Sequence, residues 1–156
     1  MKINWLLLIG FIILCNVIGA LGALWTSADS EWYQTIAKPT FNPPSWIFGP
    51  VWTLLFTLMG IALYMVWVAR LSQMRTRALI LFGAQFVLNI LWSYLFFGIN
   101  NPFASFIEIL VLEALIILTI VAFYKVNKTA GYLLIPYALW VGFASFLNYS
   151  IWMLNR

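Results

Sequence analysis

Long runs of apolar residues, separated by short polar stretches, dominate the pattern of this 156-residue chain. Each run has close to the roughly 20 residues that an α-helix needs to cross the hydrocarbon core of a bilayer. None alternates apolar and polar positions over about ten residues, as a strand of a membrane β-barrel does. The pattern predicts an all-α integral membrane protein, a bundle of five transmembrane helices at about residues 5–24, 46–69, 78–98, 103–124 and 133–154.

Composition and length agree with a single transmembrane domain over residues 1–156. Apolar residues make up 65% of the chain and charged residues 8%. This composition has too few polar residues to cover the surface of a water-soluble protein. The first apolar run resembles a secretory signal peptide, but it is longer than the roughly 7–15 apolar residues at the core of such a peptide. We expect it to stay as the first helix, followed by a long loop over residues 25–45.

Basic residues gather on one side of the predicted membrane. The amino terminus and the second and fourth connections carry Lys2, Arg70, Arg75, Arg77, Lys125 and Lys128. The other side has Lys38 and Arg156, with Asp29 and Glu31 near Lys38. Because cytoplasmic loops are enriched in lysine and arginine, we expect a multi-pass protein of the cytoplasmic membrane. Its amino terminus faces the cytoplasm, and its first loop and carboxyl terminus face outside.

The chain lacks the residues that several kinds of metal, redox and covalent chemistry require. The chain has no histidine, which excludes histidine-ligated haem, histidine metal sites and histidine general-base catalysis. Its single cysteine, Cys15, has no partner for an internal disulfide or a redox pair. No lysine lies within a predicted span, where it could form a Schiff base, and no basic groove or motif indicates a nucleic-acid partner. We expect no metal site and no required cofactor.

The third predicted helix carries a polar and aromatic face. Positions spaced by four, seven, eight and eleven residues lie on one side of a helix, and here they are Gln85, Asn89, Trp92, Ser93 and Phe96. Amides do not favour contact with lipid, so this face should turn inward. Two interpretations remain open and compatible, namely hydrogen bonds that hold helices together and the lining of a ligand site.

Two further helices carry faces of the same kind. The second has Trp52, Phe56 and Met59 in line, a largely aromatic stripe that also fits a packed core or a lipid-facing surface. In the fifth, a small residue one turn from an indole leaves room beside the ring, although small residues also permit close helix packing. That face comprises Trp140, Ala144, Leu147, Asn148 and Ile151.

Glu108 and Glu113 lie inside the fourth predicted helix. An ionisable residue at membrane depth is a candidate for function because its burial is costly unless it is satisfied. Five residues apart, the two do not share one helix face. We expect structural hydrogen bonding for both ahead of proton transfer.

The first loop contains unusually many rigid and aromatic residues. Pro39, Pro43 and Pro44 fix the backbone and bias the residues before them toward extended geometry, which favours a stiff lid. Its rings should cover a mouth whose interior holds Trp52, Trp92 and Trp140, although a loop lying on the membrane interface is the alternative. The rings are those of Trp32, Tyr33, Phe41, Trp46 and Phe48.

A roof of rings above indoles and a few amides describes a pocket for a large, flat and mostly apolar molecule such as a tetrapyrrole. Three segments carry a more specific resemblance: "WYQTIAKPTFNPPSWIFGPVWT", "QFVLNILWS" and "PYALWVGFASFLNYSIWMLN". They resemble the signature segments of the tryptophan-rich sensory protein family, also called TspO, translocator protein or peripheral benzodiazepine receptor. The likeness covers all the predicted spans, with the motifs in the same order.

This resemblance implies a membrane receptor or sensor that binds porphyrins such as protoporphyrin IX, and isoquinoline carboxamide or benzodiazepine ligands, in tetrapyrrole regulation or a stress response. It also implies a homodimer. Carried onto this sequence, the ligand-binding residues are Tyr33, Pro43, Pro44, Phe48, Trp52, Phe56, Asn89, Trp92, Ser93, Trp140, Ala144 and Leu147.

The resemblance leaves two alternatives open. One is a light-dependent porphyrin-degrading enzyme, in which Trp52 and Trp140 would be the reactive, catalytic residues and porphyrin the substrate. The other is a transporter of tetrapyrroles or other apolar ligands, for which Glu113 would couple ions.

The sequence departs from the family at two places. Phe56 replaces a tyrosine common in the family, which removes a hydroxyl from the pocket. Met153 stands where a sterol-associated motif of animal members has arginine, and six residues separate Tyr149 from Arg156, more than that motif allows. We therefore do not expect sterol binding.

Overall fold

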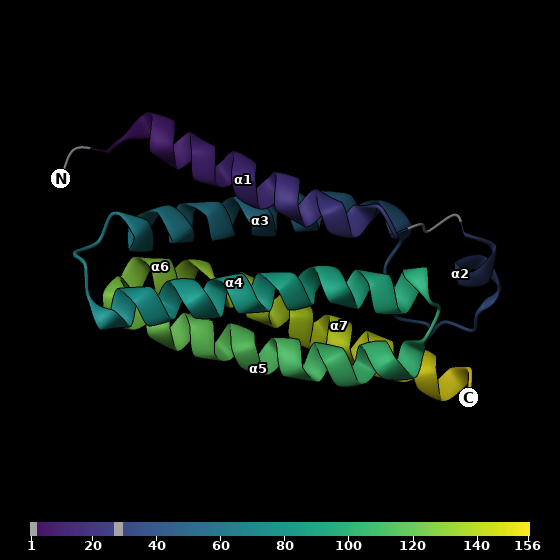
Figure 1. The fold of residues 1–156 in the computed structure, drawn as a ribbon. Coiled ribbons are helices and arrows are strands. Elements are labelled where there is room, and N and C mark those ends of the chain that lie inside the picture. Colours follow the sequence, from purple (N-terminus) through teal and green to yellow (C-terminus); the bar gives the residue numbers. More distant parts are fainter. Residues whose placement is uncertain (1–2, 27–29) are drawn as a thin grey trace.

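Five helices in the described part of the chain are long and apolar enough to cross a membrane, as predicted. The computed structural model describes residues 3–26 and 30–156, and within these ranges it contains no strand. The spans are α1 (Trp5–Ala23), α3 (Ser45–Trp67), α4 (Gln73–Ser93) with its continuation η1 (Tyr94–Gly98), α5 (Pro102–Val126), and the pair α6 (Lys128–Leu133) and α7 (Ile135–Leu154). The predicted five-helix membrane bundle is confirmed (Figure 1).

The third span begins at Gln73, five residues before the predicted start at residue 78. The side chain of Ser72 accepts a hydrogen bond from the backbone N–H of Arg75 at 3.1 Å, which caps the helix. The Arg75 side chain then donates to the carbonyl oxygens of Val66 and Trp67 at the end of α3. Arg75 and Arg77, which were expected in a loop, therefore belong to the start of a helix, whereas Arg70 stays in the connection.

The last span is also longer than predicted, because α6 adds residues 128–133 before α7. The side chain of Asn127 caps α6 by accepting from the N–H of Ala130 at 3.1 Å. Pro136 has no N–H to donate one turn back, which accounts for the break between α6 and α7. Gly131 allows α6 to lie against Tyr124 of α5, since an added Cβ would come within 2.7 Å of that residue.

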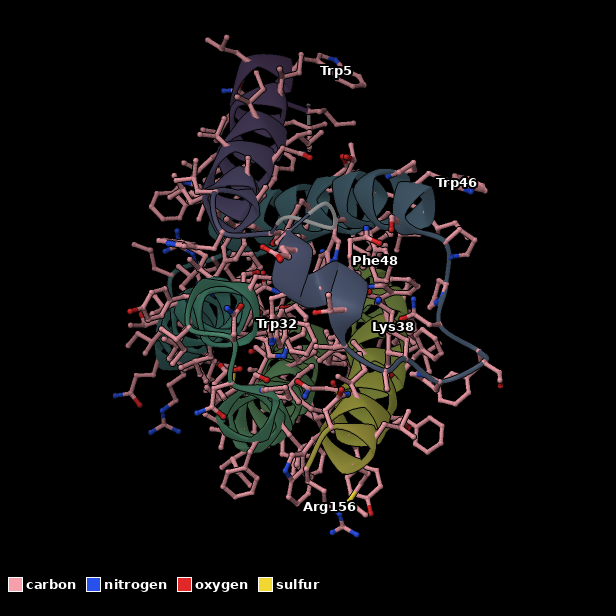
Figure 2. The ribbon with its side chains drawn as sticks, turned by 90° about the vertical axis from the view of Figure 1, so that its right-hand side faces the viewer. Trp5, Trp32, Lys38, Trp46, Phe48 and Arg156 are labelled. Atoms are coloured by element: carbon pink, nitrogen blue, oxygen red, sulfur yellow. The ribbon has the colours of Figure 1, made fainter. Side chains whose placement is uncertain are left out.

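The helices run alternately up and down, so that connections and termini collect at two ends (Figure 1). We call the end with the amino terminus and the α3–α4 and α5–α6 connections the base, and the end with α2 and the carboxyl terminus the lid end. Arg70 follows α3 and Lys125 lies in the last turn of α5, both of which end at the base, whereas Lys38 and Arg156 lie at the lid end (Figure 2). Lys2 and Asp29, which were counted in predicting the orientation in the membrane, lie outside the described residues.

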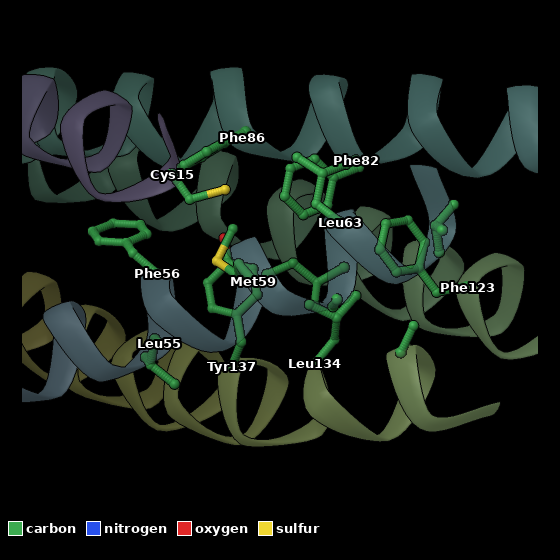
Figure 3. Packing of buried hydrophobic residues seen from close by; sticks show 14 of the residues in the cluster. Cys15, Leu55, Phe56, Met59, Leu63, Phe82, Phe86, Phe123, Leu134 and Tyr137 are labelled. Carbon is green, nitrogen blue, oxygen red and sulfur yellow. The ribbon is translucent and has the colours of Figure 1, made fainter. Parts of the chain in front are cut away.

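The half of the bundle near the base is solidly packed. Phe82 of α4 stacks on Phe123 of α5 with ring centres 5.5 Å apart, and Met59 of α3 is fully buried in the same cluster (Figure 3). Gly60 of α3 approaches the backbone of α1, since an added Cβ would lie 2.6 Å from the Cα atom of Ile12. A close helix contact of this kind needs a glycine.

The first loop contains a short helix, α2 (Glu31–Thr35), that lies across the lid end between α1, α3, α4 and α7 (Figure 2). The Ser30 side chain caps it by accepting from the N–H of Tyr33 at 3.2 Å. Beyond α2, the Asn155 side chain binds both the N–H and the carbonyl of Ala37, at 2.9 and 2.8 Å. The carboxyl end of α7 therefore holds the lid in place.

The predicted burial of the loop's rings is right for some and wrong for others. Tyr33 is buried, and Trp32 and Phe48 are half-buried. Trp46 is 74% exposed and points away from the bundle (Figure 2), and Phe41 is 43% exposed and stacks on the exposed Phe146. Rings at the lid end are equally well placed against a membrane interface, so aromatic character alone does not turn them inward.

Candidate functional site

A cavity of about 410 Å³ lies in the lid half of the bundle, enclosed by α1, α3, α4, η1 and α7 and covered by α2. Its size is in the range of small-molecule sites. Ten of the twelve predicted ligand-binding residues line it, and Pro43 and Pro44 do not. The ten are Tyr33, Phe48, Trp52, Phe56, Asn89, Trp92, Ser93, Trp140, Ala144 and Leu147.

Three indoles from three helices form the walls. Trp52 of α3 stacks on Phe56 with ring centres 5.3 Å apart. Trp140 of α7 meets the edge of Phe48 at 5.9 Å. Trp92 of α4 stacks on Phe96 at 5.2 Å. These contacts fix the planes of the indoles, so the walls are flat and preformed.

A hydrogen-bonded group at the cavity floor joins α4 to α7. The amide nitrogen of Asn89 donates to the Tyr137 hydroxyl at 3.0 Å, and that hydroxyl donates to Oε1 of Gln85 at 2.8 Å. Asn89 also lines the cavity, and its Oδ1 atom accepts no hydrogen bond from a described residue. One amide therefore both links helices and faces the cavity, so the two interpretations of this helix face stay compatible.

A second group ties Trp92 into place. Its Nε1 donates to Oδ1 of Asn148 at 2.9 Å, and the Asn148 amide donates to the carbonyl of Pro102 at 2.8 Å. The three residues come from α4, α7 and the start of α5. The same contacts satisfy the buried Asn148 side chain and hold one cavity wall.

Helix α1 forms a wall that the sequence did not indicate. Asn16 lines the cavity and donates to Thr57 of α3 at 3.2 Å. Gly19 lies against the ring of Phe56, and an added Cβ there would overlap it. The available signal was a group of small residues in this helix, Gly19, Ala20, Gly22 and Ala23, to which the sequence analysis assigned no role. Small side chains leave room for a neighbour's ring without showing any chemistry of their own.

The end of α4 departs from α-helical geometry over η1, a π-helical turn. Phe96 and Phe97 are consecutive, yet both line the cavity, and both contact Tyr33 of the lid with ring centres 6.4 and 5.4 Å apart. Wider turns of this kind occur often at functional sites. Periodicity predicts Phe96 on this face but not Phe97.

The cavity is open on one side, between α1 and α3. The lining residues on this side are small or polar and exposed, unlike those on the other walls. They are Ala20, Ala23, Thr26, Ser45, Gly49 and Thr53. An opening between two transmembrane helices faces the bilayer, so the cavity borders lipid as well as the space above the lid.

Tyr33 forms part of the roof. Burial raises the pKa of its hydroxyl above the ordinary value for tyrosine, so the group stays protonated at neutral pH and is available to donate a hydrogen bond. No aspartate, glutamate, lysine or arginine is among the described lining residues. The site is therefore apolar and aromatic, with amides and hydroxyls at a few points, and suits binding better than acid–base chemistry.

Glu108 and Glu113 lie away from the cavity. Glu108 is buried, and neither of its carboxyl oxygens has a hydrogen-bond partner among the described residues; Oε2 of Glu113 is likewise buried and unpartnered. The expected structural hydrogen bonding is therefore wrong for both side chains. Glu113 lies near Gly142 of α7, since an added Cβ there would be 3.8 Å from its Oε1 atom, and a glycine side chain offers no donor.

The model of the TspO/MBR family matches residues 11–153. This range includes the whole of the cavity described above.

Individual relatives extend the likeness over almost the entire chain. The chain is 44% identical to the tryptophan-rich protein TspO of Archaeoglobus fulgidus over 154 residues, 97% of this chain and 99% of the relative. It is 43% identical to the tryptophan-rich protein TspO of Chlorobaculum tepidum over 144 residues, 91% of each chain. It is 34% identical to the translocator protein of Bos taurus over 155 residues, 97% of this chain and 92% of the relative.

Proposed function

The chain belongs to the TspO/MBR family, and we propose that it is a membrane receptor for porphyrins and other flat, apolar ring ligands. The ligand lies in the cavity of the lid half, with its ring faces against the indoles. The same cavity accepts isoquinoline carboxamide and benzodiazepine ligands. Binding reports tetrapyrrole levels and needs no cofactor.

One observation carries this proposal. Trp52, Trp92 and Trp140 project from three helices into a single cavity whose described lining has no charged side chain. Flat aromatic ligands gain most from stacked or edge-on contact with fixed rings. Asn89, with a free acceptor on the cavity wall, supplies one directional polar contact.

We further propose that the protein resides in the cell membrane with its base toward the cytoplasm. The distribution of Arg70, Arg75, Arg77, Lys125 and Lys128 at the base supports this orientation. The lid and the carboxyl terminus then face outside. The homodimer implied by the family stays a prediction.

The test is a titration of protoporphyrin IX into purified protein, followed by porphyrin absorbance so that removal of tryptophans does not alter the readout. The double variant Trp52→Phe, Trp140→Phe should bind at least about tenfold more weakly, because two indole faces are reduced to smaller rings. The matched control is Trp5→Phe with Trp46→Phe, which removes two indoles that lie outside the cavity. Equal affinity of all three proteins would refute the cavity as the binding site.

A second candidate function is the light-driven breakdown of bound porphyrin. The position of both Trp52 and Trp140 on the cavity wall favours it. Excited porphyrin converts dioxygen to its singlet form, which adds across a carbon–carbon double bond of the macrocycle or an indole. Cleavage of that adduct gives two carbonyl groups, so both oxygen atoms end in the product and no other oxidant is needed.

Illumination of the complex in air, followed by mass spectrometry of porphyrin and protein, separates this function from binding alone. Repeated turnover of porphyrin to one product, absent from a mixture with free tryptophan, supports an enzyme. Gain of two oxygen atoms on Trp52 or Trp140 that ends after one event supports a receptor damaged by its ligand.

A further inference from the structure

Lys38 lies over the roof of the cavity. Its Nζ atom is 4.6 Å from the centre of the Tyr33 ring, and Tyr33 lines the cavity. Seen from the lid end, Lys38 lies near the middle of the bundle and Arg156 lies at its edge (Figure 2). The Lys38 ammonium is therefore held on one face of the Tyr33 ring. A ligand in the cavity would approach the same ring at its opposite face or at its edge.

The ammonium group of Lys38 has few partners of its own. It donates one hydrogen bond, to the carbonyl of Ile36 at 3.5 Å, which is long for an N–H···O contact. No described carboxylate forms an ion pair with it. Since an ammonium has three donors, the group is free to bind an added anion.

The cavity below the lid has no cationic group that could pair with an anion. Its described lining has amides, hydroxyls and indole N–H groups but no basic side chain. Moving a carboxylate from water into such a site is costly unless the charge is paired. A ligand with an apolar ring and an acidic edge should therefore place the ring between the tryptophans and the acidic edge at the lid.

Resting on the function proposed above, we propose that Lys38 is a specificity residue that pairs with a carboxylate on the edge of the ligand. It selects flat ring molecules with an acid group and sets which edge points toward the lid. Protoporphyrin IX, with two propionates on one edge of its macrocycle, has this chemistry. Its dimethyl ester keeps the ring and lacks the charges, so the pair of probes isolates the contribution of the acid.

The experiment titrates both probes into protein in a neutral maltoside detergent, which contains no phosphate. The wild type should bind the acid about fivefold more tightly than the ester, the upper end for a partly exposed ion pair. Lys38→Gln should abolish this preference by weakening the acid alone, and Lys38→Arg should keep it. Arg156→Gln is the matched control, since it removes the same charge at the same end of the bundle but away from the roof.

Two results would overturn the role of Lys38: an unchanged preference in Lys38→Gln, or equal weakening of acid and ester. A third arm uses nanodiscs with phosphatidylglycerol. If anionic lipid alone removes the preference of the wild type, Lys38 binds a lipid headgroup and the proposal fails. Failure of the binding function itself looks different, because the ester would then bind the wild type and the Trp52→Phe, Trp140→Phe variant alike.

Discussion

In the base half of the bundle α1 and α3 touch backbone to backbone, whereas toward the lid end they part around the cavity. Gly60 and Ile12 meet in this half, and Asn16 and Thr57 form the last polar contact before the helices separate. Beyond Gly19 the facing positions line open space. The comparison shows how a membrane bundle keeps a hollow half, since the packed base fixes the helix positions that the cavity needs.

The rings in the two halves also differ in what surrounds them. Phe82 and Phe123 stack within a closed core, while Trp52 and Trp140 are half-buried and have one face on the cavity. Close packing leaves no room for a ligand at the base. Disruption of the base should therefore reduce stability, and filling of the lid half should reduce binding.

The largest effect is expected from Gly60→Leu. A side chain at this position would collide with the α1 backbone, and we expect the free energy of unfolding to fall by about 3 kcal/mol. Thermal denaturation in detergent measures this. Gly10→Leu is the control, because a Cβ at Gly10 has no neighbour within 4 Å; equal destabilisation by both variants would contradict the close contact at the base.

Ala144→Phe should fill the hollow half. Ala144 lines the cavity one turn from Trp140, so a ring there takes the place of a ligand. Affinity for protoporphyrin IX dimethyl ester should fall about tenfold or more, with the melting temperature nearly unchanged. Leu139→Phe, at a 71% exposed position on the same helix, is the control. Unchanged affinity in Ala144→Phe would mean that the ligand binds elsewhere.

Tyr137→Phe tests the boundary between the two halves. The variant removes the hydroxyl that joins Asn89 to Gln85, and the free energy of unfolding should fall by about 1 kcal/mol, as for other hydrogen bonds between membrane helices. Tyr94→Phe, which loses the hydroxyl of a residue that is 41% exposed, is the control. Thermal denaturation measures both variants. An equal loss of stability in Tyr137→Phe and Tyr94→Phe would contradict a structural role for these hydrogen bonds.

The smallest effect is expected from Gly49→Leu at the opening between α1 and α3. The added side chain meets nothing within 4 Å at its Cβ, so the fold is preserved while the opening narrows. The association rate of the ester from liposomes should fall by only about threefold, since substitutions change association less than dissociation. Stopped-flow fluorescence measures the rate, with Gly10→Leu as the control; an unaltered rate would indicate entry through the lid.

Much of this arrangement could be predicted from the sequence because it rests on strong signals. Apolar length fixes the spans, and the helix repeat aligns Asn89, Trp92 and Ser93, all of which line the cavity. The α1 wall was missed because Gly19 and Ala20 carry no chemistry. Phe97 was missed because a π-helical turn breaks the repeat.

The lid shows a further limit of sequence patterns. Tyr33 and Trp46 are both aromatic residues near prolines, yet one forms the roof and the other points away. What separates them is tertiary contact, since Phe96 and Phe97 receive Tyr33 and no ring contact holds Trp46 within the described chain. An indole is as stable at a membrane interface as in a protein interior. The sequence pattern alone therefore does not show which of these rings turns inward.

The most direct test of the hollow lid half is an experimental structure of the protein with protoporphyrin IX bound. We expect density for the macrocycle inside the cavity, with its faces toward Trp52 and Trp140 and the base packed as described. Density for the porphyrin on the lipid-facing surface, with the side chains of Trp52 and Trp140 filling the space between the helices, would contradict the account.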